Sequence, residues 1–188
     1  GDYFIKEEFF NDLPQQYMTI HATSGKGQWE GRHYRGYQEV LDNIKNLYPD
    51  LKIIQVGSSD ESQLSVDLDL RGKTNYQQLA FVVKNSLLHL SPDTFTMHLA
   101  CALGTPAVSL FACSDVTATG PWVKDLQRAK FLLLQSQRLS GCKNNPCYKN
   151  RCKKCDDPAG PMNEILEQHV IQACERLLRG YENVETKS

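Results

Sequence analysis

The sequence predicts a three-layer α/β fold, in which a Rossmann-like parallel sheet lies between two layers of helices. Two observations carry this prediction. Short β-rich runs alternate along the chain with segments whose apolar residues recur at three- and four-residue steps. Polar or glycine-containing turns follow several of the β-rich runs. Such an alternation indicates parallel strands joined by right-handed crossovers.

The N-terminal part supplies the first strand, helix and second strand. YMTIH (17–21) is β-rich and predicts a buried strand. From Tyr34 to Leu47, apolar residues at helical spacing form one stripe, and Pro49 with Asp50 ends this helix. LKIIQV (51–56) predicts the next strand, which the polar turn 57–61 closes.

The middle of the chain repeats the pattern. DLDLRGKT (67–74) predicts a short extended piece and a turn, and the apolar spacing from Tyr76 to Val83 predicts a helix. A strand is expected to begin at Leu87 and to break at SPDT (91–94). From Met97 to Leu103 the spacing is helical again, and the glycine that follows is expected to stop the helix.

The C-terminal part contains two more expected strands and a last helix. AVSLF (107–111) and FLLLQ (131–135) are β-rich, and the pattern between them is irregular. Apolar residues from about Asn163 to Arg179 lie on one helical face, and Gly180 is expected to cap the helix.

The length and composition predict one domain. A chain of 188 residues with 40% hydrophobic residues can bury a substantial core, and no internal repeat or low-complexity linker divides it. We expect an irregular lead-in or interdomain connection at 1–15, a tail at 181–188, and a domain at 16–180. That domain includes the last helix and a cysteine-rich loop at 141–156.

The charge balance argues against general attraction to nucleic acid or to anionic membranes. The chain has 21 basic and 22 acidic residues, with a net charge of -1. No run approaches the roughly 20 apolar residues of a membrane span, and the first residues lack a signal-peptide layout. We therefore expect a cytoplasmic protein without a nucleic-acid partner. The abrupt start at Gly1 suggests a piece of a longer protein.

The turn at 91–94 is a candidate phosphate site. In open α/β sheets, ligands bind beyond the carboxyl ends of strands, where helices begin with unsatisfied N–H groups. An anion there gains hydrogen bonds and the favourable end of the helix dipole. The loop 22–31 adds two hydroxyls, three glycines and a lysine, although it does not have the spacing of a Walker loop.

Four stretches carry a resemblance to a known family. They are YMTIHATSGKGQW, DLRGKTNYQQLA, SPDTFTMHLACALGTPAVSLF and the cysteine-bearing NPCYKNRCKKC before the last helix. Their order resembles the C-terminal, donor-binding half of glycosyltransferase family 9, the lipopolysaccharide heptosyltransferases of two-domain GT-B architecture. The resemblance covers residues 17–178, and its third stretch is the most specific.

The resemblance implies a bacterial enzyme of cell-surface glycan or lipopolysaccharide synthesis, peripheral to the inner membrane. It implies that this half holds a nucleotide-diphosphate sugar, with heptose as the sugar, for an inverting transfer that needs no cofactor. The acceptor is a glycan, lipid or protein bound mainly by an N-terminal half. Because the family's catalytic base belongs to that half, the resemblance assigns no catalytic residue to this chain, which is expected to be inactive alone.

Matching by motif assigns the donor and its phosphates to Thr23, Ser24, Lys26, Asp93, Thr94 and His98. A lysine with several N–H and O–H donors neutralises charge that grows on a leaving diphosphate. Asp93 suits sugar hydroxyls or the turn itself. Phe95 stands where the family commonly has a glycine, which lets backbone approach the phosphate.

Simpler explanations exist for each of these residues. Asp93 or Thr94 could cap the helix, which is compatible with an anion site, and His98 could be a core histidine. Lys26 could be a solvated loop lysine. Glu61 lies where a carboxylate takes ribose hydroxyls, and Lys73 lies near the same crevice, although exposed-turn chemistry explains a lysine there equally well.

The cysteines fall into two groups. Three sit singly in apolar segments, as small core residues do. The others form C-x4-C-x4-C-x2-C: Cys142, Cys147, Cys152 and Cys155. Four thiolates could surround a structural zinc or iron, and two disulfides or reduced thiols are the alternatives. The basic loop around them suggests a rival function, a non-catalytic interaction or assembly module.

Overall fold

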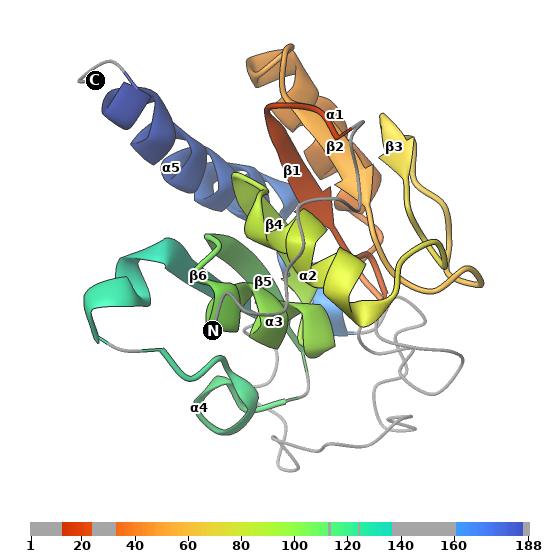
Figure 1. The fold of residues 1–188 in the computed structure, drawn as a ribbon. Coiled ribbons are helices and arrows are strands. Elements are labelled where there is room, and N and C mark those ends of the chain that lie inside the picture. The colour runs from red at the N-terminus through yellow and green to blue at the C-terminus, as the bar shows by residue number, and fades with distance from the viewer. Residues whose placement is uncertain (1–12, 24–32, 113, 124, 137–160, 186–188) are drawn as a thin grey trace.

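The structure is a computed structural model that describes residues 13–23, 33–112, 114–123, 125–136 and 161–185 (Figure 1). Its strands are β1 (Tyr17–Ile20), β2 (Lys52–Gln55), β3 (Leu68–Asp69), β4 (Leu88–Pro92), β5 (Ala107–Phe111) and β6 (Phe131–Gln135). They form one six-stranded sheet in the order β3-β2-β1-β4-β5-β6, and every neighbouring pair is parallel. The predicted parallel sheet is therefore confirmed.

Helices cover both faces of this sheet. They are α1 (Tyr37–Leu47), α2 (Tyr76–Lys84), α3 (Phe95–Leu103), α4 (Val116–Thr119) and α5 (Glu167–Glu185), with 3-10 helices η4 (Asp125–Lys130) and η6 (Pro161–Glu164). Helices α1 and α5 pack together on one face, and α2 and α3 pack together on the other (Figure 1). The three-layer prediction is confirmed.

Alternation along the central strands separates the two cores. Met18 and Ile20 of β1 belong to the apolar cluster under α1 and α5, whereas Tyr17 belongs to a cluster on the opposite face. In a strand, successive side chains point to opposite faces. Thr19 and His21 therefore lie on the same face as Tyr17, under α2 and α3.

The ends of the helices follow from local sequence. Asn75 caps α2: its side chain accepts from the Gln78 N–H at 2.9 Å, and the Gln78 side chain accepts from the Asn75 N–H at 3.0 Å. Gly104 ends α3 in a left-handed conformation with φ of 74°, as the sequence predicted.

Strand β4 runs further than predicted, through Ser91 and Pro92. The N–H groups of His89 and Asp93 donate to carbonyls of the β5 side, while Leu90 accepts from the β1 side. The nitrogen of Pro92, which carries no hydrogen, thus faces the β1 side. Because β1 has already ended there, the proline costs the sheet no ladder hydrogen bond.

Three further differences concern helices. The last helix begins at Glu167, four residues after expected, and continues through Gly180 to Glu185, so the predicted stop at this glycine is wrong. A glycine weakens a helix without preventing it when the helix packs on a core. Short helices α4 and η4 occupy the segment before β6, which had no recognisable period.

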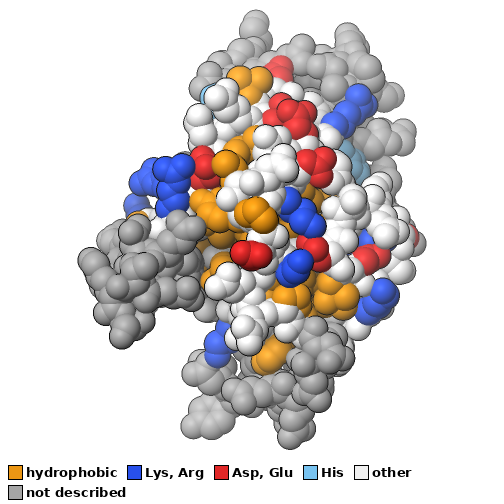
Figure 2. Space-filling view, turned by 90° about the horizontal axis from the view of Figure 1, so that it is seen from above, with side chains coloured by type: hydrophobic (Ala, Val, Ile, Leu, Met, Phe, Trp, Pro, Cys, Tyr) orange, Lys and Arg blue, Asp and Glu red, His pale blue; other side chains and the backbone are white. Residues whose placement is uncertain are grey.

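The surface shows no general preference for polyanions. In Figure 2, basic and acidic side chains are interspersed with hydrophobic ones over the visible described face. Within the described ranges, no helix combines the length and apolar character needed to cross a bilayer.

Candidate functional site

A pocket of about 1180 Å³ opens beyond the carboxyl ends of β1, β2 and β4. Strand order reverses between β1 and β4, which is where open α/β sheets bind ligands. The described lining residues are His21 after β1, Gly57, Ser58 and Glu61 after β2, Gly72, Thr74, Asn75, Tyr76 and Leu79 around the start of α2, and Asp93, Thr94, Phe95, Thr96 and Leu99 around the start of α3.

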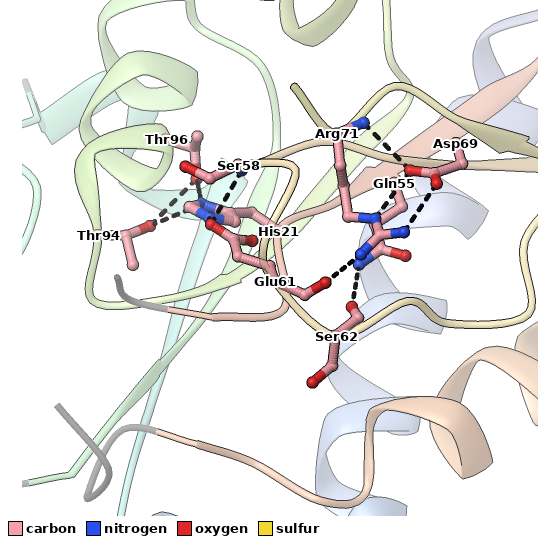
Figure 3. Close-up of polar contacts among 9 residues, drawn as sticks. All are labelled: His21, Gln55, Ser58, Glu61, Ser62, Asp69, Arg71, Thr94 and Thr96. Atoms are coloured by element: carbon pink, nitrogen blue, oxygen red, sulfur yellow. Dashed lines mark hydrogen bonds and ion pairs between the residues drawn. The ribbon is translucent and has the colours of Figure 1, made fainter. Parts of the chain in front are cut away.

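His21 connects the loop after β2 with the start of α3. Its Nε2 lies 3.1 Å from Glu61 Oε1, and its Nδ1 lies 2.9 Å from Thr96 Oγ1 (Figure 3). The Ser58 N–H donates to the same Glu61 oxygen at 3.0 Å. These contacts fix a buried carboxylate at the wall of the pocket.

Glu61 is held in its ionised form. Burial raises the pKa of this carboxyl, but the hydrogen bond and charge of His21, the Ser58 N–H and the Thr23 hydroxyl together outweigh burial, so its pKa is lowered below the usual value. Glu61 Oε2 is buried and has no hydrogen-bond partner among the described residues. The carboxylate therefore retains acceptor capacity beside the pocket.

Arg71 fixes the backbone of the Glu61 loop from the opposite side (Figure 3). Its guanidinium forms a two-pronged contact with Asp69 at 2.9 and 2.8 Å and also donates to the carbonyl of Glu61. Asp69 thereby raises the pKa of Arg71, and the Arg71 side chain is only 9% exposed. Such a planar fork positions its partners more firmly than a point charge does.

The first turn of α3 is open toward the pocket. Thr94 occupies the N-cap position, but its hydroxyl lies 3.1 Å from Thr96 Oγ1 and 3.4 Å from His21 Nδ1 and makes no capping bond to the helix backbone. Asp93 is buried, and its Oδ2 accepts from Thr119 Oγ1 at 3.2 Å. The alternative that Thr94 caps the helix through a side-chain hydrogen bond is therefore wrong. The Met97 N–H donates to the Thr94 carbonyl at 3.2 Å, so the N–H groups of Phe95 and Thr96 are the ones that this end of the helix can offer to a ligand.

The structure brings together only some of the predicted site residues. Glu61, Asp93 and Thr94 line the pocket, and Thr23 is buried at the end of the segment that follows β1, where its hydroxyl helps to lower the pKa of Glu61. Ser24, Lys26, Cys142, Cys147, Cys152 and Cys155 lie outside the described residues.

Two predicted residues do not reach the pocket wall. His98 is exposed on α3 and is absent from the described lining, so the alternative of a core histidine is also wrong. Lys73 is exposed, and its Nζ donates to the carbonyl of Asp69 at 2.7 Å. This lysine braces its own turn.

His21, Thr96 and Arg71 were not predicted as site residues. His21 had a usable signal, since a histidine directly after a buried strand lies at the ligand-binding edge of the sheet. Thr96 contacts His21, 75 positions away, which no local pattern indicates. Arg71 contacts Asp69 and the Glu61 carbonyl, two and ten positions away, through a forked contact that no motif of the sequence indicates. Among the described residues, no three His, Cys, Asp or Glu side chains form a group that could hold a metal ion.

The sequence has relatives among heptosyltransferases. Residues 51–149 match the profile of glycosyltransferase family 9 (heptosyltransferase). The chain is 27% identical over 132 residues to the lipopolysaccharide core heptosyltransferase OpsX of Haemophilus influenzae, which covers 64% of this chain and 37% of the relative.

Two solved structures share the fold. Escherichia coli ADP-heptose lipopolysaccharide heptosyltransferase II matches with a TM-score of 0.62 at 16% identity, over 90% of this chain and 48% of that one. The iron-containing dodecameric glycosyltransferase TibC of enterotoxigenic E. coli matches with a TM-score of 0.65 at 14% identity, over 89% and 47%.

The chain spans less than half the length of these relatives. Its sheet and helices are those of one half of a GT-B glycosyltransferase, and the profile match covers more than half of its residues. The chain therefore belongs to glycosyltransferase family 9, the heptosyltransferase family.

Proposed function

We propose that this chain is the half of an inverting glycosyltransferase that binds the nucleotide-diphosphate sugar, with heptose as the transferred sugar. One observation carries the proposal. The pocket at the reversal of strand order combines an uncapped helix start with a buried, ionised carboxylate held by His21. The names of the relatives, one of which includes ADP-heptose, support a heptose donor and a role in lipopolysaccharide synthesis.

The start of α3 would hold the diphosphate. The N–H groups of Phe95 and Thr96 and the Thr94 hydroxyl would donate hydrogen bonds, and the helix dipole favours negative charge there. Ser24 and Lys26 would contribute from the loop that begins after Thr23. Their charge and donors stabilise the diphosphate as it leaves the sugar, which is where negative charge increases during transfer.

Glu61 would bind the nucleoside. Its lowered pKa keeps it a pure acceptor, and its unpartnered Oε2 can accept a ribose hydroxyl once a ligand enters. The contacts from His21 and Ser58 leave this oxygen free while fixing the other one. This division gives a carboxylate that is oriented before the ligand arrives.

The transfer itself would require an N-terminal half that binds a glycan, lipid or protein acceptor and supplies the catalytic base. A two-domain protein of about twice this length fits the shared fold and the partial coverage of the relatives. In this proposal the chemistry needs no cofactor, and the enzyme works at the cytoplasmic side of the inner membrane.

For the cysteine cluster we propose a separate, structural role as a metal site. Four thiolates at that spacing suit zinc or iron, and the fold is shared with a protein described as iron-containing. Metal analysis of protein purified under reducing conditions tests it. Less than about one metal per chain, with four titratable thiols in that loop, would contradict the proposal.

Calorimetric titration of the chain with ADP and with an ADP-sugar tests the donor site. We expect Lys26→Ala, Thr94→Ala and Glu61→Gln each to weaken binding by about tenfold or more, the value of a hydrogen bond to a charged group. Lys130→Ala is the control. This exposed lysine lies just before the amino-terminal end of β6, whereas the pocket lies beyond the carboxyl ends of the strands. Absence of binding to either ligand, or unchanged affinity in the three variants, refutes the proposed function.

A further inference from the structure

Two aromatic side chains stand exposed at the pocket. Tyr76 is 79% exposed and Phe95 is 55% exposed, although most large hydrophobic side chains of the described residues are buried. Both line the pocket, and they begin α2 and α3 respectively. Their ring centroids lie 5.9 Å apart with an interplanar angle of 76°. The pair contributes little to the core, so packing does not explain it.

The lining of the pocket combines two chemically different sets of side chains. One set is the buried carboxylate of Glu61 with His21, and the other is Tyr76 and Phe95 with the apolar side chains of Leu79 and Leu99. A ligand that uses both sets must have a hydroxyl-bearing part joined to a flat apolar part. A nucleoside has this construction, and a free sugar or a free diphosphate does not.

The geometry of the rings suits a planar ligand. In an edge-to-face pair, the edge of one ring points at the face of the other, so another face of the pair remains open for stacking. Exposed aromatic faces in ligand sites commonly stack on nucleobases, because every base has a π-face. Phenylalanine also has no hydrogen-bond donor for phosphate, so its side chain at the first position of α3 must serve something other than the diphosphate.

We propose that Tyr76 and Phe95 form the stacking site for the nucleobase of the donor and that Phe95 determines how strongly the base contributes to affinity. This inference rests on the proposed function. It assigns the base to the start of α2 and α3, the ribose to Glu61 and the diphosphate to the first turn of α3.

Paired titrations separate this contact from the rest of the site. The chain is titrated with ADP, which has a base, and with pyrophosphate, which has none. We expect Tyr76→Ala and Phe95→Ala each to weaken ADP binding about fivefold or more, from the usual value of base stacking, and to leave pyrophosphate binding unchanged. Tyr76→Phe keeps the ring and should retain the wild-type affinity for ADP.

Two further variants test whether the aromatic ring itself, at this site, is what binds the base. Phe95→Leu keeps an apolar side chain but has no ring. It should weaken ADP binding nearly as much as Phe95→Ala does. Trp122→Ala is the control for an exposed aromatic, since Trp122 is 92% exposed and does not belong to the described pocket lining.

The outcomes distinguish the two proposals. If the wild-type chain binds neither ligand, the proposed function fails. If it binds ADP but the alanine variants keep its affinity, or lose affinity equally for ADP and pyrophosphate, only the stacking site fails. A loss that appears with an ADP-sugar and not with ADP would assign the rings to the sugar and would also overturn the inference.

Discussion

Replacing Gly57 by alanine should move the Glu61 carboxylate. A Cβ at Gly57 would lie 2.3 Å from Glu61 Oε2 and 3.0 Å from His21 Cδ2, and no real contact is that short on the carboxylate side. The φ of this glycine is also +137°, a conformation that side chains with Cβ rarely adopt. The substitution therefore combines backbone strain with displacement of a charged group.

The two costs can be estimated separately. Backbone strain costs about 1–3 kcal/mol. Loss of the Glu61 contacts to His21 and Ser58 costs roughly a further 2 kcal/mol, because each is a hydrogen bond to a charged group but the carboxylate can turn toward the open pocket. The sum, about 3–5 kcal/mol, corresponds to a fall in Tm of about 10 °C for a chain of this size.

Gly104→Ala is the matched control. Gly104 also has a positive φ, +74°, but a Cβ there meets no atom within 4 Å. We expect only the left-handed backbone cost, about 1–2 kcal/mol or a Tm lower by about 4 °C, and unchanged nucleotide affinity. Gly57→Ala should lower nucleotide affinity as well as stability.

Thermal unfolding and ADP titration of single and double variants check this reasoning. In a Glu61→Ala background, Gly57→Ala should cost only the backbone term, so the two substitutions should be strongly non-additive. Additive losses of stability, or an affinity for ADP that Gly57→Ala leaves unchanged, would refute the view that this glycine exists to seat the carboxylate.

Three other predictions concern charged groups of the described fold. Burial, with a smaller effect of His21, lowers the pKa of His89 from 6.5 to about 3. Because the unfolded chain takes up this proton at a higher pH than the folded chain, the free energy of unfolding should fall by about 1.4 kcal/mol per pH unit between pH 6 and 3. Urea unfolding at several pH values should show that the stability of His89→Leu depends less steeply on pH. The lowered pKa of Glu61 contributes stability that is present above the usual carboxyl pKa and is lost as the pH falls below it. Glu61→Gln should therefore lose less stability than the wild type on acidification from pH 5 to pH 3. Equal losses would contradict the lowered pKa of Glu61. Arg71→Lys should weaken ADP binding nearly as much as Arg71→Ala, because a lysine cannot reproduce the forked contact that positions Glu61, and full recovery of affinity in the lysine variant would contradict that role.

Local pattern predicted the sheet well because each strand is a short apolar run with clear ends. Five of the six strands were expected, β3 lies in the stretch expected as a short extended piece, and β5 and β6 have the predicted bounds. The continuation of β4 through Pro92 was not expected, because a strand can contain a proline here only since the neighbouring β1 has already ended. The length of α5 was also misjudged, because a glycine weakens a helix without ending it.

The site was only partly predictable, for a different reason. Asp93 and Thr94 follow a strand directly, so topology alone places them at the pocket. His98 belongs to the same motif but is absent from the described pocket lining. The buried residues Met97, Ala100 and Cys101 define the inner face of α3, and a residue one position after Met97 points away from it. The contacts of His21 with Glu61 and Thr96 join residues 40 and 75 positions apart.

The packing of α5 on α1 has a consequence during synthesis. Strand residues cover part of the apolar stripe of α1, and α5, which covers the rest, follows all six strands in the sequence, about 130 residues after α1 begins. At roughly 5–20 residues per second, a growing chain leaves the part under α5 uncovered for about 6–26 s. The opposite face acquires α2 and α3 much earlier. A chaperone that recognises exposed apolar surface on the nascent chain should therefore meet the α1 face and should be released when α5 emerges.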